Sequence, residues 1–162
     1  KTGAGMDYIR QETEKLVSYC QGRDVVTVED VEKVCATQTT SHIFDMISAI
    51  ANKKQQQALD LYYDLLELKE PPMRILYLIV RQFNGILQVK DLMSRGISGK
   101  EIASKIGAAP FVVGKYQAQA KYFEMNTLLD ALNECAKTEE AVKQGRLNDR
   151  LGVELIIIKY SK

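Results

Sequence analysis

The chain has 162 residues, of which 46% are hydrophobic and 27% charged, the composition of a folded globular protein rather than of a disordered or fibrous one. Lysine and arginine total 22 and aspartate and glutamate total 21, so the formal net charge is +1. This balance excludes a protein that holds nucleic acid through its overall charge, and it leaves only a local basic patch for that role.

Metal ligands are sparse in the sequence. The three cysteines, Cys20, Cys35 and Cys135, form no C-x-x-C pair, and His42 is the only histidine. A zinc site takes about four clustered Cys, His or carboxylate ligands, and that spacing is absent. We therefore expect no metal ion, and three reduced thiols that are buried or half-buried, as is usual in a cytoplasmic protein.

No apolar run approaches the roughly 20 residues that a membrane-spanning helix needs. The densest apolar cluster, residues 75–80, lies between Arg74 and Arg81. The first residues have no apolar centre, so they do not resemble a signal peptide. Because the chain begins without methionine and enters a helical pattern almost at once, we expect a fragment of a longer cytoplasmic protein that has no membrane partner.

Almost every segment has the apolar spacing of a helix. Residues 6–20 are predicted to form a first helix, and Thr27 and Asp30 have the spacing of a capping box at the start of a second one. Such a hairpin, of about 35 residues, is too small to build a core of its own. Residues 36–41 are polar, so we predict a linker or hinge there, with Ser41 as the N-cap of the next helix.

Three helices are predicted between this hinge and Gly96. Two amphipathic helices cover residues 41–52 and 53–69, and the double proline that follows ends the second, since proline lacks a backbone donor but suits the first turn of a new helix. The third helix, residues 73–95, has apolar side chains over more than half of its circumference. A helix of this kind is predicted to lie at the centre of its domain.

The C-terminal part continues the helical pattern. Residues 126–144 are predicted to form an amphipathic helix. The last segment, 148–160, contains an isoleucine run with β-propensity, but no partner strand is evident in the sequence. Because Leu151, Leu155 and Ile158 share one helical face, we predict a helix here too, and an all-α fold for the chain.

Residues 98–123, SGKEIASKIGAAPFVVGKYQAQAKYF, have the outline of a helix-turn-helix. The first half begins with a Ser98–Glu101 capping box and turns at Gly107. The second half begins with apolar residues that favour burial, which leaves four donors for DNA: Lys115, Gln117, Gln119 and Lys121. We favour a packing hairpin, and a DNA-binding regulator that uses residues 98–123 remains the alternative.

The sequence contains no signature of an active site. It has neither the G-x-S-x-G motif of a serine nucleophile nor a phosphate-binding glycine loop. His42 is predicted to lie in the first turn of its helix rather than in a catalytic triad. We therefore assign no catalytic, cofactor-binding or metal-binding residue, and we expect no intrinsic enzymatic activity.

Taken together, the segments resemble the family of delta subunits of the bacterial DNA polymerase III clamp loader. The resemblance extends over essentially the whole chain, and its specificity lies in the order of the segments more than in any one of them. RQF after the double proline and the I-G-x-x-P-F-x-V-x-K-x-x-x-Q-A segment are the most specific. The matching segments, in chain order, are GMDYIRQETEKLVSY, TVEDV, SHIFDMISAI, ALDLYYDLLELKEPPMRILYLIVRQFNGILQVKDL, GISGKEIASKIGAAPFVVGKYQAQAKYF and LGVELIIIKY.

The resemblance implies a division into two parts. Residues 1–40 would be the end of the helical lid of an AAA+ module, and residues 41–162 an all-helical collar domain through which the clamp-loader subunits associate. It implies a non-catalytic assembly module without a cofactor, in a subunit of the DNA polymerase III holoenzyme, a DNA-directed DNA polymerase. The implied partners are the other loader subunits, with the sliding clamp and DNA reached only through the complete subunit or complex.

A collar domain presents faces to its neighbours, and interfaces are enriched in aromatic residues. Five tyrosines lie away from the main apolar stripes of the predicted helices. We therefore expect a subunit interface among Tyr63, Tyr77, Tyr116, Tyr122 and Tyr160.

Overall fold

The computed structural model describes residues 10, 13–14, 16–20, 25–27 and 38–162. It divides into two compact units, Lys1–Gln38 and Thr39–Lys162. In the first unit the described residues 10, 13–14 and 16–19 are helical, within the first predicted helix. The second predicted helix lies mainly outside the described residues.

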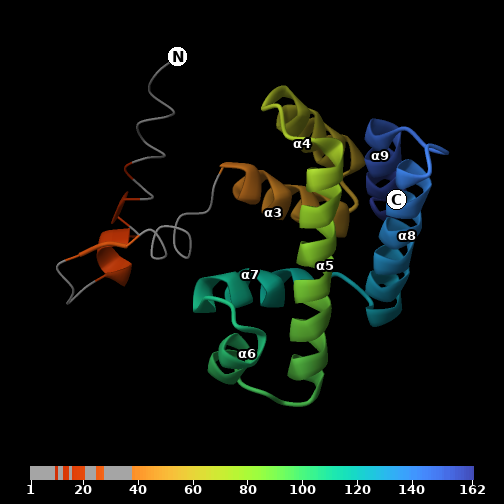
Figure 1. Cartoon of the computed structure of the whole chain (residues 1–162). Helices are drawn as coiled ribbons and strands as arrows, with labels where there is room; N and C mark the ends of the chain where they lie inside the picture. Colours follow the sequence, from red (N-terminus) through yellow and green to blue (C-terminus); the bar gives the residue numbers. More distant parts are fainter. Residues whose placement is uncertain (1–9, 11–12, 15, 21–24, 28–37) are drawn as a thin grey trace. The chain divides into compact units, whose positions relative to one another are not determined.

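Residues 38–162 are helical between short turns, and no strand occurs in that range (Figure 1). The all-α class and the helical last segment are therefore confirmed for this range. The helices are α3 (Gln38–Ala51), α4 (Gln55–Glu67), α5 (Pro72–Ser94), α6 (Gly99–Ile106), α7 (Pro110–Ala120), α8 (Met125–Lys143) and α9 (Asp149–Tyr160).

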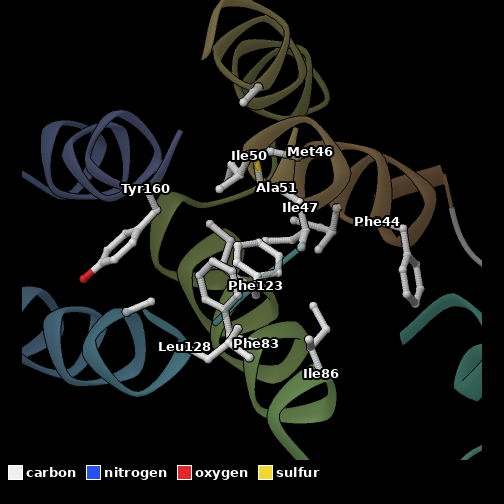
Figure 2. Packing of buried hydrophobic residues seen from close by; sticks show 14 of the residues in the cluster. Phe44, Met46, Ile47, Ile50, Ala51, Phe83, Ile86, Phe123, Leu128 and Tyr160 are labelled. Carbon is white, nitrogen blue, oxygen red and sulfur yellow. The ribbon is translucent and has the colours of Figure 1, made fainter. Parts of the chain in front are cut away.

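Helix α5 is the central helix, as its apolar pattern predicted. It contacts α6, α7, α8 and α9, and in Figure 1 it stands between the α6–α7 pair and the α8–α9 pair. Figure 2 shows Phe83 and Ile86 of α5 pointing into the same core as Ile47 of α3. Phe83 meets Phe123 edge-on, with 5.7 Å between the ring centroids. The fully buried apolar side chains of α5 are Ile75, Leu76, Ile79, Phe83, Ile86 and Val89.

The turns follow the local chemistry that the sequence predicts. Pro71 is the N-cap of α5 and Pro72 occupies its first turn, where the missing backbone donor costs no hydrogen bond. Gly107, between α6 and α7, has φ +64°, a left-handed conformation that a side chain would strain. The prolines therefore set the start of α5, and Gly107 sets the turn before α7. Helix α4 itself ends at Glu67, before the prolines, in a turn where Lys69 has φ +64°.

The start of α3 corrects the predicted hinge. Gln38, Thr39, Thr40 and Ser41 are helical, so Ser41 is not an N-cap, and His42 lies beyond the first turn. The Thr39 hydroxyl donates a 2.7 Å hydrogen bond to Glu70, at the α4–α5 turn. This tertiary hydrogen bond and the burial of the later residues of α3 stabilise the helix at its start, where the low helix propensity of threonine is unfavourable. Residues 36–37 lie outside the described part of the chain.

Candidate subunit interface

The structure divides the five candidate tyrosines into two groups. Tyr63, Tyr77 and Tyr122 are 40%, 64% and 61% exposed, whereas Tyr116 and Tyr160 are buried. The expectation of an accessible ring is therefore wrong for Tyr116 and Tyr160. Both rings lie in the core, and each of these two tyrosines has a specific packing or hydrogen-bonding partner that the sequence did not reveal.

Tyr116 packs between α3 and α5. Its ring lies 5.8 Å from that of Phe44, measured between centroids. On the other side it lies against Gly85, where a Cβ atom would come within 2.6 Å of ring carbons. Burial raises the pKa of Tyr116, and the charge of Arg81 offsets part of this rise. Tyr116 thus joins α7 to the central helix.

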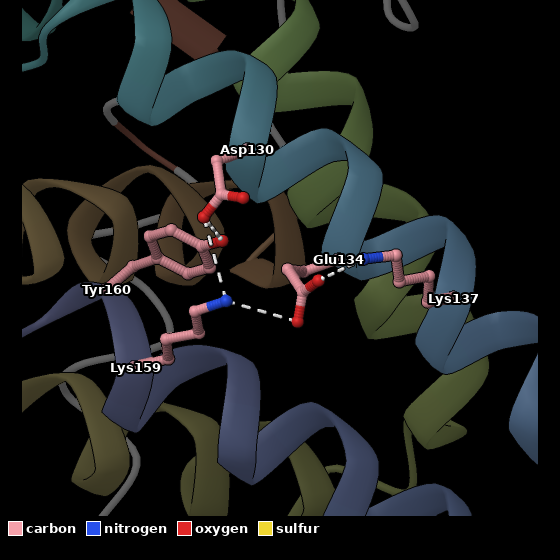
Figure 3. Close-up of polar contacts among 5 residues, drawn as sticks. All are labelled: Asp130, Glu134, Lys137, Lys159 and Tyr160. Carbon is pink, nitrogen blue, oxygen red and sulfur yellow. Dashed lines mark hydrogen bonds and ion pairs between the residues drawn. The ribbon is translucent and has the colours of Figure 1, made fainter.

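Tyr160 belongs to a polar cluster that joins α9 to α8 (Figure 3). Its hydroxyl donates a 2.6 Å hydrogen bond to Asp130. Lys159 Nζ lies 3.1 Å from Glu134 and 3.6 Å from Asp130, and Lys137 Nζ lies 2.8 Å from Glu134. The hydrogen bond from Tyr160 lowers the pKa of Asp130, and desolvation together with this bond raises the pKa of Tyr160. Each carboxylate has a positive partner, so the cluster positions α9 rather than offering an acid or a base.

On its opposite side α9 is joined to α4. The Tyr62 hydroxyl donates to the Arg150 carbonyl at 3.0 Å, and the Tyr63 hydroxyl donates to Glu154 at 2.9 Å. Burial raises the pKa of Tyr62 to about 12. At the start of α9, the Asn148 side chain accepts a hydrogen bond from the backbone of Leu151, which is the usual contact of an N-cap. Helix α9 is therefore fixed on two flanks and at its N-terminus.

The remaining side of α9 is an apolar face without a partner in the described chain. Leu151 and Leu155 are 47% and 48% exposed, and Ile158 is half-buried. We call these three residues the outer face of α9. The sequence indicated that they share one face, but the opposite side of the helix supplies the core residues: Gly152, Val153, Ile156, Ile157 and Tyr160.

A groove of about 660 Å³ lies beside the N-terminal end of this face. Sequence reasoning missed it, because it forms where the α4–α5 turn meets the start of α9, two segments far apart in the chain. Neither the adjacent prolines nor Arg150 belongs to a sequence motif that would predict a groove. Its lining residues are Tyr63, Leu66, Glu67, Lys69, Glu70, Pro71, Pro72 and Arg150.

Within the described ranges, no three His, Cys, Asp or Glu side chains are grouped so that they could hold a metal ion. None of the described helices has the length and apolarity that crossing a membrane requires. Cys20 and Cys135 are buried, as predicted, and neither forms a disulfide within the described residues, whereas Cys35 lies outside them. Burial raises the pKa of Cys135 to about 12, so this thiol is a poor nucleophile at neutral pH.

Residues 40–160 match the family described as DNA polymerase III delta subunit, C-terminal domain. The chain belongs to this family. It is 33% identical over 154 residues to the DNA polymerase III subunit delta of Bacillus subtilis, a match that covers 95% of this chain and 44% of that protein. A solved structure of a Bacillus subtilis DNA clamp loader delta protein superimposes with a TM-score of 0.76 at 33% identity, over 94% of this chain and 45% of the other. The chain therefore spans a little under half the length of these relatives.

In this delta-family chain, residues 98–123 form the predicted pair of helices, α6 and α7, which pack on α5. Gln119, one of the four donors considered for DNA, is buried and donates to the Phe44 carbonyl at 3.0 Å and to Ser48 at 2.8 Å. Gln82 in turn donates to Gln119 at 2.7 Å. Lys115 Nζ lies 4.5 Å from the Phe44 ring centroid. Two of the four donors therefore interact with the protein itself, which gives no support to a DNA-reading helix.

The first turn of α7 differs from the expectation in one respect. Phe111 was expected to be buried with its neighbours, yet it is 46% exposed, whereas Val113 is buried. In a helix only one side of the first turn reaches the core, and Val113 occupies it.

Proposed function

We propose that the chain is a non-catalytic assembly module of a DNA polymerase III delta subunit, within a clamp loader that places the sliding clamp on primed DNA. The single observation that carries the proposal is the superposition on the Bacillus subtilis clamp loader delta protein, with a TM-score of 0.76 over 94% of this chain. At 33% identity, the likeness extends to the sequence as well as to the fold.

Residues 1–40 are assigned to the end of an AAA+ helical lid, and residues 41–162 to the collar domain. The separation of two compact units between Gln38 and Thr39, two residues before the proposed boundary, supports a division in this region. The long, buried α5 and the helices packed on both of its sides give residues 41–162 the rigidity that a ring of neighbouring collars requires.

The proposed partners are the other subunits of the loader, which the collar contacts directly. The sliding clamp and DNA are partners of the complete subunit or complex, and no cofactor or membrane is involved. The proposed location is the cytoplasm, where the DNA polymerase III holoenzyme works.

Size-exclusion chromatography with light scattering tests this function. The full-length protein that carries this chain is mixed with the other loader subunits of its organism, each verified as folded. We expect one multi-subunit peak that contains all of them. A protein that elutes alone beside intact partner subunits would refute the assignment.

A further inference from the structure

The outer face of α9 is apolar, although its side chains do not pack in the core. Leu151, Leu155 and Ile158 recur at the i, i+4 and i+7 positions of one helical side, yet the buried residues lie on the other side. Scattered exposed leucines are ordinary, but a continuous apolar stripe on a well-packed helix marks an interaction surface. Helix α9 thus has two apolar sides, and the described chain covers one of them.

This face is already held in the shape that a partner would meet. The tyrosine hydroxyls of α4 hold one flank of α9, and the Asp130–Tyr160 hydrogen bond holds the other. The N-cap at Asn148 fixes the first turn. Because these contacts exist without the partner, binding loses little conformational freedom on this side of the interface.

The groove extends the face toward α4. Arg150 lines it and precedes Leu151 in the chain, and Tyr63 lines it while donating to Glu154, one turn further along α9. Tyrosine and arginine are the residue types that most often contribute binding energy at interfaces. The apolar stripe and the groove therefore form one continuous surface.

The charges around this surface decide between possible occupants. The most exposed charged residues of the α9 segment, Arg150, Lys159 and Lys162, are all basic. The acidic residues Asp149 and Glu154 are half-buried, and each accepts a hydrogen bond from within the chain. Lys159 is paired across to α8, so Arg150 and Lys162 remain at the two ends of the stripe. In the groove, Glu70 is paired with Arg74, and the exposed Glu67 and Lys69 carry opposite charges, so Arg150 and Lys162 supply the net charge of the surface. A second copy would bring these basic residues together, whereas an acidic rim is complementary.

We propose that the outer face of α9 and its groove receive an amphipathic helix of a neighbouring clamp-loader subunit. Apolar side chains of that helix cover Leu151 and Leu155, and Asp or Glu residues at its edges meet Arg150 and Lys162. The inference rests on the proposed function and adds to it the surface used and the chemistry of the partner.

The test measures the affinity of the full-length delta-family protein for the other loader subunits by surface plasmon resonance. Leu151→Glu and Leu155→Glu are each expected to weaken binding by about 10-fold or more, as for residues at the centre of an interface. Arg150→Glu should weaken it several-fold and make the affinity less sensitive to salt.

The matched control is Leu129→Glu on α8, because Leu129 is a leucine of similar exposure, 51% against 47% for Leu151. It should bind like the unaltered protein. Leu151→Glu is not expected to unfold α9, because a carboxylate in the first turn of a helix stabilises its N-terminus. A loss of binding by this variant therefore reports on the surface rather than on folding. Thermal unfolding followed by circular dichroism checks this for every variant.

The outcomes separate the two proposals. If the unaltered protein binds no loader subunit, the proposed function fails and this inference fails with it. If it binds them and both leucine variants bind equally well, the surface is wrong while the function stands. If light scattering shows a homodimer that Leu155→Glu dissociates, the occupant is a second copy and the inference is overturned.

Discussion

Replacing Gly85 with alanine tests how closely α5 and α7 approach each other. Gly85 lies within α5, and a Cβ atom there would come within 2.6 Å of two ring carbons of Tyr116 and 2.9 Å of its hydroxyl. That is roughly 1 Å shorter than the favourable separation of two carbon atoms, about 3.5–4.0 Å. The ring is buried and backed by Phe44, so it has little room to withdraw.

Two effects of opposite sign determine the magnitude. Alanine is favoured over glycine inside a helix by about 0.5–1 kcal/mol. Inserting a methyl group into a packed core costs about 1–3 kcal/mol, and a contact this short belongs in the upper half of that range. We expect Gly85→Ala to lower the free energy of unfolding by about 1–2.5 kcal/mol, and the melting temperature by about 3–8 °C.

Urea and thermal unfolding, followed by circular dichroism at 222 nm, measure the effect. Gly114→Ala is the matched control, since Gly114 lies within α7 and a Cβ there would meet no atom within 4 Å; this change should stabilise the protein by about 0.5–1 kcal/mol. In a Tyr116→Ala background, Gly85→Ala should also become stabilising. Stabilisation by Gly85→Ala in the unaltered protein would refute the close packing of Tyr116 on α5.

Three further predictions concern buried polar groups. Gln119→Leu removes the acceptor of the Gln82 amide inside the core, and we expect the free energy of unfolding to fall by about 2–4 kcal/mol in urea titrations. Tyr160→Phe removes the hydrogen bond that lowers the pKa of Asp130, so in carboxyl-carbon NMR titrations this pKa should rise toward 3.8. The Cys135 thiol, with its pKa raised to about 12, should react with iodoacetamide at pH 8 at least about 100-fold more slowly in the native protein than in urea.

The effect of Tyr160→Phe on stability has a definite sign. A carboxyl group whose pKa is lower in the folded state contributes stability above its unfolded pKa, and that contribution is lost as the pH falls through the folded pKa. Without the bond, the acid-side fall in stability should be shallower. An unchanged pH dependence would contradict the role of this bond. An unaltered free energy of unfolding for Gln119→Leu would contradict the prediction about the Gln82–Gln119 hydrogen bond. Labelling of Cys135 in the native protein as fast as in urea would contradict the prediction about its buried thiol.

Some features were predictable because they depend on neighbours along the chain. The double proline set the start of α5, and Gly107 set the turn before α7. The apolar circumference of α5 identified it as the central helix, since such a helix is stable only when surrounded. The resemblance to delta subunits likewise needed only the order of segments in the sequence.

Other features depended on residues far apart in the chain. The polar residues 38–41 had the composition of a hinge, yet a hydrogen bond from Thr39 to Glu70 helps to hold them in a helix. Tyr116 and Tyr160 were expected at an interface, but Gly85 leaves space for one ring and Asp130 provides an acceptor for the other. No property of a tyrosine or of its sequence neighbours carries that information.

For residues 38–162, the sequence by itself determined the helices and most of their ends, because propensity, capping and periodicity act within a few residues. It also indicated the family. Only the tertiary structure decided which side of α9 faces the core. The helix has apolar residues on both sides, so its own pattern is ambiguous. The close approach at Gly152, where a Cβ atom would lie 2.9 Å from Thr138 of α8, and the bonds to Asp130 and Tyr63 resolve it. They turn Leu151 and Leu155 outward, where the core can no longer cover them.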